Sequence, residues 1–87
     1  MKAYCEYVES ANVFIRTFLQ NTEEDELKWH WDEEDRIIES LHPTDWQFQF
    51  DNRLPIDFSE PVFCSQGTIH RVIKGTGDLQ LKITKVI

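Results

Sequence analysis

The histidines of this 87-residue chain are the first candidates for chemistry, because imidazole both binds metals and transfers protons near neutral pH. His30 lies in the sequence WHWDEEDR, and in an extended strand His30, Asp32 and Glu34 would share one face. With His70 added, these nitrogen and carboxylate ligands would suit a first-row divalent metal ion. From the residues alone we favour the other interpretation, that both histidines are buried or half-buried, are hydrogen-bonded to carboxylates and hold no cofactor.

Arg36, Arg71 and Lys74 are candidates for binding an anion, since a guanidinium can hold a carboxylate through two parallel hydrogen bonds. If Arg36 points into the interior, it could share an anionic ligand with Arg71, Lys74 and the histidines His30 and His70. The sequence favours a different role for Arg36, an ion pair with a neighbouring carboxylate. The candidate partners are Asp32, Asp35 and Glu39.

Several other chemistries have no support in the sequence. A glycine-rich phosphate loop, a nucleophile elbow and a paired cysteine–histidine nucleophile are all missing from it. Cys5 and Cys64 belong to no metal-binding or disulfide spacing, and we expect both to be buried free thiols. Nucleotide hydrolysis and covalent catalysis are therefore not indicated.

The charge of the chain points away from nucleic acid. The net charge is -7, and acidic residues crowd the stretch 23–35, where they would repel a phosphate backbone. This acidic stretch could instead bind a basic protein, or it could be a solvated loop. The sequence contains neither the apolar core of a signal peptide nor a run of ~20 apolar residues, so we expect a cytoplasmic protein without a membrane partner.

The elements that must position these residues are mostly strands. The sequence WQFQFD at 46–51 alternates aromatic and polar residues, as a half-buried strand does. Turn signals such as GTGD at 75–78 recur along the chain and favour one sandwich or barrel. Further strands are predicted over 2–8, 12–20, 56–58, 62–64, 68–73 and 79–84. We therefore predict a single all-β domain over residues 1–87.

Residues 22–41 admit two interpretations. Thr22 could cap a helix over about residues 22–35, with Leu27 and Trp31 on its apolar side, which would make the fold α+β. Against the helix, Glu34 and Asp35 interrupt the apolar stripe, and residues 36–41 also fit a strand. The all-β interpretation is the one we favour.

The sequence resembles the cupin superfamily, whose first motif contains His-x-His and whose second contains Pro-x-Gly-x-x-His. His30 matches the first histidine of the first motif, while Gly67 and His70 match the second motif. Departures from the first motif are Asp32 for its second histidine and Arg36 or Ile37 for its glutamate. The resemblance implies a small cupin-like barrel or sandwich with His30 and His70 facing its interior.

Residues 29–83 also resemble small cupin-like proteins of tailed phages, through WHWDEEDR, WQFQFDN and GTIHRVIKG. We favour a non-enzymatic phage-type accessory protein that binds a host or defence protein through its acidic surface, or that sequesters a small anionic ligand. The first alternative is a metal-dependent cupin enzyme, an isomerase or oxygenase, using His30 and His70. A structural or housekeeping domain is the second. Exposed edge strands also make a homodimer plausible.

Overall fold

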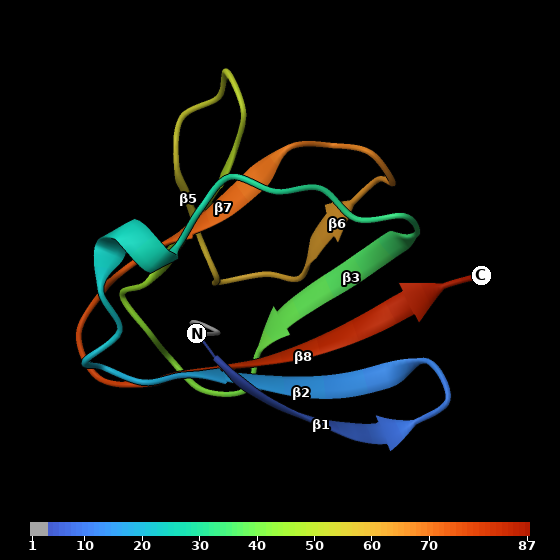
Figure 1. Cartoon of the computed structure of the whole chain (residues 1–87), viewed down its shortest axis with the longest axis horizontal. Coiled ribbons are helices and arrows are strands. Elements are labelled where there is room, and N and C mark those ends of the chain that lie inside the picture. The colour runs from blue at the N-terminus through green and yellow to red at the C-terminus, as the bar shows by residue number, and fades with distance from the viewer. Residues whose placement is uncertain (1–3) are drawn as a thin grey trace.

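The computed structural model describes residues 4–87, which form antiparallel strands and one single-turn 3-10 helix (Figure 1). The strands are numbered along the chain and keep the labels of Figure 1. They are β1 (Cys5–Ser10), β2 (Val13–Phe18), β3 (Asp35–Ser40), β4 (Gln47–Phe50), β5 (Ile56–Asp57), β6 (Val62–Cys64), β7 (His70–Ile73) and β8 (Leu79–Val86). The 3-10 helix η1 (Glu24–Glu26) lies between β2 and β3.

The strands form two sheets that pack in a sandwich-like arrangement. The larger sheet has the order β1-β2-β8-β3-β6, and the smaller has the order β5-β4-β7. The segment after η1 connects β2 to β3, which both belong to the larger sheet. In Figure 1 this segment runs past β7 of the smaller sheet before it enters β3. The predicted all-β architecture is confirmed.

The core lies between the two sheets and is built from the inward positions of alternating strands. Trp46 is 0% exposed and Phe48 is 1% exposed, as the aromatic alternation of 46–51 predicts. The indole Nε1 of Trp46 donates a hydrogen bond of 3.1 Å to the Gly77 carbonyl, so its one polar atom is satisfied. From the larger sheet the core receives Phe14, Phe18, Ile38, Val62, Cys64, Leu79, Leu81 and Ile83.

The alternative helix over residues 22–35 is wrong. Only Glu24–Glu26 turn helically, and this 3-10 turn contains no buried residue. A helix in water needs an apolar face to bury, and the acidic residues of this stretch leave none. Beyond Leu27 the chain is extended, and His30 forms an isolated antiparallel bridge with His70. The strand interpretation of residues 36–41 is confirmed by β3.

Among residues 4–87, no helix has the length and apolar character that crossing a membrane requires.

Candidate metal centre

The site forms where the extended segment after η1 lies against the start of β7. The His30 N–H donates to the His70 carbonyl at 3.0 Å, and the His70 N–H donates to the His30 carbonyl at 2.9 Å. The turn before β7 is fixed to the same segment, because the Gly67 N–H donates to the Asp32 carbonyl at 2.8 Å. Gly67 has a φ of +76°, a conformation that favours glycine. Backbone hydrogen bonds therefore set the relative positions of His30, Asp32 and His70.

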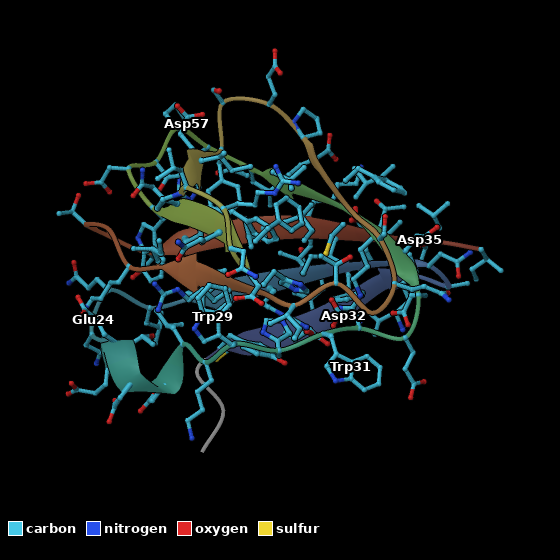
Figure 2. The ribbon with its side chains drawn as sticks, turned by 90° about the horizontal axis from the view of Figure 1, so that it is seen from above. Glu24, Trp29, Trp31, Asp32, Asp35 and Asp57 are labelled. Carbon is cyan, nitrogen blue, oxygen red and sulfur yellow. The ribbon has the colours of Figure 1, made fainter. Side chains whose placement is uncertain are left out.

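The side chains of His30, Asp32 and His70 converge. One potential ligand atom from each lies within 4.8 Å of the others. The two imidazole rings are 4.2 Å apart at their centroids, and Nε2 of His70 lies 3.2 Å from Oδ2 of Asp32. Burial is graded across the group, since His70 is 2% exposed, Asp32 is half-buried and His30 is exposed. Figure 2 shows Asp32 turned toward the interior while Trp31, beside it in sequence, points away.

Backbone carbonyls fix the proton positions of both imidazoles. Nδ1 of His30 lies 3.1 Å from the Lys28 carbonyl, and Nδ1 of His70 lies 2.8 Å from the Thr68 carbonyl. A carbonyl oxygen only accepts, so each Nδ1 must carry the hydrogen. In a neutral imidazole this leaves the lone pair on Nε2 free to bind a metal. Histidines that ligate metals are usually oriented by such a hydrogen bond.

Asp32 provides a test of whether the group fits a metal ion. Its Oδ2 atom is buried and lies 3.2 Å from Nε2 of His70. In the metal-free protein the protonated His70 ring faces this oxygen, and a bound metal ion would take the place of that proton. Adjacent ligands around an ion with bonds of ~2.1 Å are separated by roughly 3 Å, close to this contact. The residues present therefore fit a bound metal ion.

The electrostatics of the group couple it to pH. Burial lowers the pKa of His70, but the Asp32 carboxylate, the Cys64 sulfur and the Thr68 carbonyl outweigh burial and raise it to about 9. Burial raises the pKa of Asp32, but His70 and Arg36 outweigh this effect and hold it below its ordinary value. Partial burial of its ring lowers the pKa of His30. Without a metal, His70 is thus an imidazolium facing a carboxylate at neutral pH, while His30 is neutral.

Phe48 and Cys64 support His70 from the core. The Phe48 ring stacks on the imidazole with centroids 5.2 Å apart, and Sγ of Cys64 lies 3.3 Å from Nδ1. Both residues are 1% exposed. Of the two thiols expected to be buried, Cys64 is buried but Cys5 is exposed, because every residue of the outer strand β1 is exposed.

Glu34 and Arg36 lie next to the group but outside it. Glu34, proposed from the sequence as a ligand, pairs with Arg36 at 2.8 Å and with Lys85 at 3.8 Å. Arg36 also pairs with Asp32 at 3.2 Å, the kind of ion pair that the sequence favoured for it. Glu34 is absent from the converging group because the Glu34 side chain is directed toward these two cations. It lies immediately before β3, which begins at Asp35.

Arg71 and Lys74 are not brought together with Arg36. The Arg71 guanidinium lies 4.4 Å from the centroid of the Trp29 ring and donates to Oε1 of Gln49 at 2.9 Å. Arg71 and Lys74 line a separate hollow of about 140 Å³ that does not include Arg36. The shared anion site suggested by the sequence would need Arg36, Arg71 and Lys74 around one cavity. In the structure they line two different cavities.

A larger cavity of about 390 Å³ opens beside His30 and Asp32 and reveals a residue that the sequence reasoning missed. Arg16 lines this cavity together with Arg36. The signal was present in the sequence, because Phe14, Arg16 and Phe18 occupy alternate positions of β2, and the two phenylalanines are buried. A charged residue at an inward position of a strand indicates a cavity or an ion pair.

Known structures share this fold at low sequence identity. The DMSP lyase DddQ from Ruegeria pomeroyi aligns with a TM-score of 0.66 and 14% identity, over 97% of this chain and 47% of the lyase. A protein from Neisseria meningitidis aligns with a TM-score of 0.64 and 12% identity, over 99% of this chain and 88% of that one. A cupin domain from Bordetella pertussis aligns with a TM-score of 0.59 and 10% identity, over 97% and 92%.

These likenesses establish a cupin-like fold, as the sequence motifs implied, and at such identities they establish the fold alone. This chain spans about half the length of the DMSP lyase it matches. No protein-family model and no curated protein matches the chain in sequence. The chain thus has a cupin-like fold in which two histidines and one aspartate converge beside a cavity.

Proposed function

We propose that this protein binds a divalent transition metal ion through His30, Asp32 and His70 and uses it to bind and activate a small molecule in the adjacent cavity. The observation that carries this proposal is the convergence of two imidazole nitrogens and one carboxylate oxygen within 4.8 Å. The buried Oδ2 of Asp32, which lies 3.2 Å from Nε2 of His70, supports it. When bound, the metal supplies a Lewis acid that polarises an oxygen of the ligand.

The number and type of ligands favour a reactive site over a structural one. Structural zinc sites use four protein ligands, whereas catalytic sites use three and leave a position open. Two histidines and one carboxylate form the ligand set of non-haem iron(II) enzymes and also suit zinc. His30 is exposed and lines the cavity, so a small molecule can reach this ligand from solvent.

This proposal reverses the preference that the sequence alone supported. Without coordinates, the loss of the usual cupin glutamate and second histidine argues against a metal. The structure instead brings Asp32 against both histidines. A phage origin and the binding of a host protein through the acidic stretch 23–35 stay predictions, because no contact among residues 4–87 bears on either.

The test is metal binding by the purified protein and its variants. The protein would be stripped with chelator, dialysed, and titrated separately with Zn²⁺, Fe²⁺ under anaerobic conditions, and Co²⁺, with metal content measured by plasma mass spectrometry. His30→Ala is the most informative variant, because His30 is exposed and its loss should not disturb folding. His42→Ala is the matched control, since this third histidine lies in the turn after β3 and outside the converging group, with its Nδ1 against the Pro43 carbonyl.

The expected result is one equivalent of metal in the wild type and in His42→Ala, and none in His30→Ala or Asp32→Asn. Co²⁺ should also produce visible absorption bands that His30→Ala lacks. Binding that survives in both His30→Ala and Asp32→Asn would place the metal elsewhere. Absence of metal from the wild type with all three ions would overturn the proposal.

A further inference from the structure

Arg16 is a half-buried cation whose position the proposed metal site does not require. It lies in the middle of β2, facing inward between Phe14 and Phe18, opposite Leu81 of β8. Its side chain is only 12% exposed. A guanidinium placed among aromatic residues loses much of its hydration, so a fold that puts one there needs anionic groups to face it.

The Arg16 guanidinium is held in one orientation. It lies 3.9 Å from the centroid of the Tyr4 ring, a cation–π contact, and it pairs with Oε2 of Glu6 through Nε at 2.9 Å and Nη2 at 2.8 Å. Its remaining nitrogen, Nη1, has no hydrogen bond or ion pair with any residue that the structure describes. The Nε and Nη2 nitrogens of Arg16 are therefore paired with Glu6, whereas Nη1 is free to donate to a ligand.

Arg16 lines the same cavity as two of the proposed metal ligands. Arg16, His30 and Asp32 all line the cavity of about 390 Å³. Lys28 and Arg36 add two further cations to the wall, against the carboxylates of Glu26 and Asp32. A divalent ion on the proposed ligands would make the cavity more positive, which attracts an anion.

The rest of the cavity wall limits the size and polarity of the occupant. Tyr4, Phe18, Leu27 and Val72 supply apolar surface between the cations. A volume of about 390 Å³ lies at the small end of ligand pockets, which span roughly 300–1,000 Å³. The cavity thus combines a fixed cation, a short apolar wall and a candidate metal centre.

We propose that this cavity binds a small organic carboxylate, with Nη1 of Arg16 donating to its carboxylate group and a second oxygen of the ligand directed to the metal. The part that concerns the metal rests on the function proposed above. The part that concerns Arg16 does not, because Arg16 lines the cavity whether or not a metal is bound. A dicarboxylate of three or four carbons has the size and charge that this arrangement would hold.

The experiment is calorimetric titration with malonate, with its neutral analogue malonamide and with inorganic phosphate. Each would be titrated into chelator-stripped and Zn²⁺-loaded protein at low ionic strength. The variants are Arg16→Gln, Arg16→Lys and the control Arg53→Gln, since Arg53 lies exposed in the turn after β4 and does not line the cavity. Circular dichroism would confirm that each variant is folded.

Malonate is expected to bind, and malonamide should bind at least about tenfold more weakly because a hydrogen bond to a charged group is lost. Arg16→Gln should weaken malonate by a similar factor, Arg16→Lys should weaken it less, and Arg53→Gln should leave it unchanged. If Arg16→Gln fails to fold, the comparison of malonate with malonamide in the wild type still tests whether the cavity requires a carboxylate. Phosphate that binds as tightly as malonate would show an inorganic anion site in place of a carboxylate site.

The two proposals can fail separately. Malonate that binds stripped protein through Arg16 while Zn²⁺ does not bind would overturn the metal site and keep the carboxylate site. Zn²⁺ that binds without any difference between malonate and malonamide, or between wild type and Arg16→Gln, would overturn the carboxylate site alone. An increase in malonate affinity on Zn²⁺ loading, lost in His30→Ala, would support both.

Discussion

The two halves of the candidate metal site are built in different ways. His70 belongs to β7, is 2% exposed and stacks on Phe48, so regular pairing and core packing position it. His30 and Asp32 lie on the extended segment between η1 and β3, which has no regular strand partner beyond the single bridge to His70. Figure 2 shows this segment along the outside of the barrel, with Trp31 directed into solvent.

This contrast shows how a small barrel can combine rigidity with access. A ligand atom needs a fixed position, which the core provides through β7 and Phe48. An open coordination position needs a route from solvent, which only an exposed segment can provide. We therefore expect changes to the β7 half to alter stability strongly, and changes to the extended half to alter metal binding more than stability.

Phe48→Ala should produce the largest effect. Phe48 is 1% exposed, packs with Phe50 and Phe58, and supports the His70 ring. Loss of its side chain should lower the free energy of unfolding by about 3–5 kcal/mol, because a cavity remains in the core. Urea unfolding of Phe48→Ala beside Phe63→Ala measures this. Phe63 is 55% exposed, and its loss should cost less than about 1 kcal/mol.

The sequence specified the β7 half of the site more fully than the extended half. Alternation along residues 46–51 identifies the inward positions of β4, including Phe48, because a strand has only two faces. The cupin-like motifs also place Gly67 and His70 at a turn and the strand that follows it. These features depend on local pattern, and the structure contains them as predicted.

The extended half could not be predicted in the same way. Which carboxylate joins His30 depends on the bridge to His70 and on the Gly67 hydrogen bond, and both are contacts between distant parts of the chain. Strand alternation placed Asp32 and Glu34 on one face without distinguishing them, and the structure directs Glu34 to Arg36 and Lys85. Arg16 was missed because its cavity exists only after β2 meets the segment after η1.

The pH dependence of stability should report the contact between the two halves. In metal-free protein the folded pKa of His70 is about 9, above the ordinary 6.5, because Asp32, Cys64 and Thr68 outweigh its burial. A raised histidine pKa stabilises the fold fully below pH 6.5, and the stabilisation is lost as the pH rises to about 9. We expect a loss of up to about 3 kcal/mol across this window.

Urea unfolding with chelator present, at several pH values from 6.5 to 9, measures this loss. Asp32→Asn is the informative variant, since it removes the carboxylate that holds the His70 proton. Its stability should change less across the same window. Equal slopes in the wild type and Asp32→Asn would show that the His70–Asp32 contact does not control the titration. The lowered pKa of Asp32 acts far below this window, and that of His30 acts at and below its lower edge.

Metal binding should fasten the extended half to the β7 half. An ion that binds only the folded state stabilises it by about 2.7 kcal/mol at a concentration 100 times its dissociation constant. Zn²⁺ should therefore raise the melting temperature of the wild type and of His42→Ala but not of His30→Ala. Exchange of the His30 amide hydrogen, which is bonded to the His70 carbonyl, should slow in the same samples. If Zn²⁺ stabilised His30→Ala as much as the wild type, the metal would not join the two halves through His30.

Trp31→Ala should have the smallest effect and define where the extended half is anchored. Trp31 is 58% exposed, so its removal should change the free energy of unfolding by less than about 0.5 kcal/mol, although it lies between two proposed metal ligands. Trp29 is less exposed and receives the Arg71 guanidinium on its ring, so Trp29→Ala should cost about 1 kcal/mol. Thermal and urea unfolding of both variants would separate them. A larger loss in Trp31→Ala than in Trp29→Ala would mean that the exposed face of this segment carries its stability, and the division of the site into a packed half and an accessible half would have to be given up.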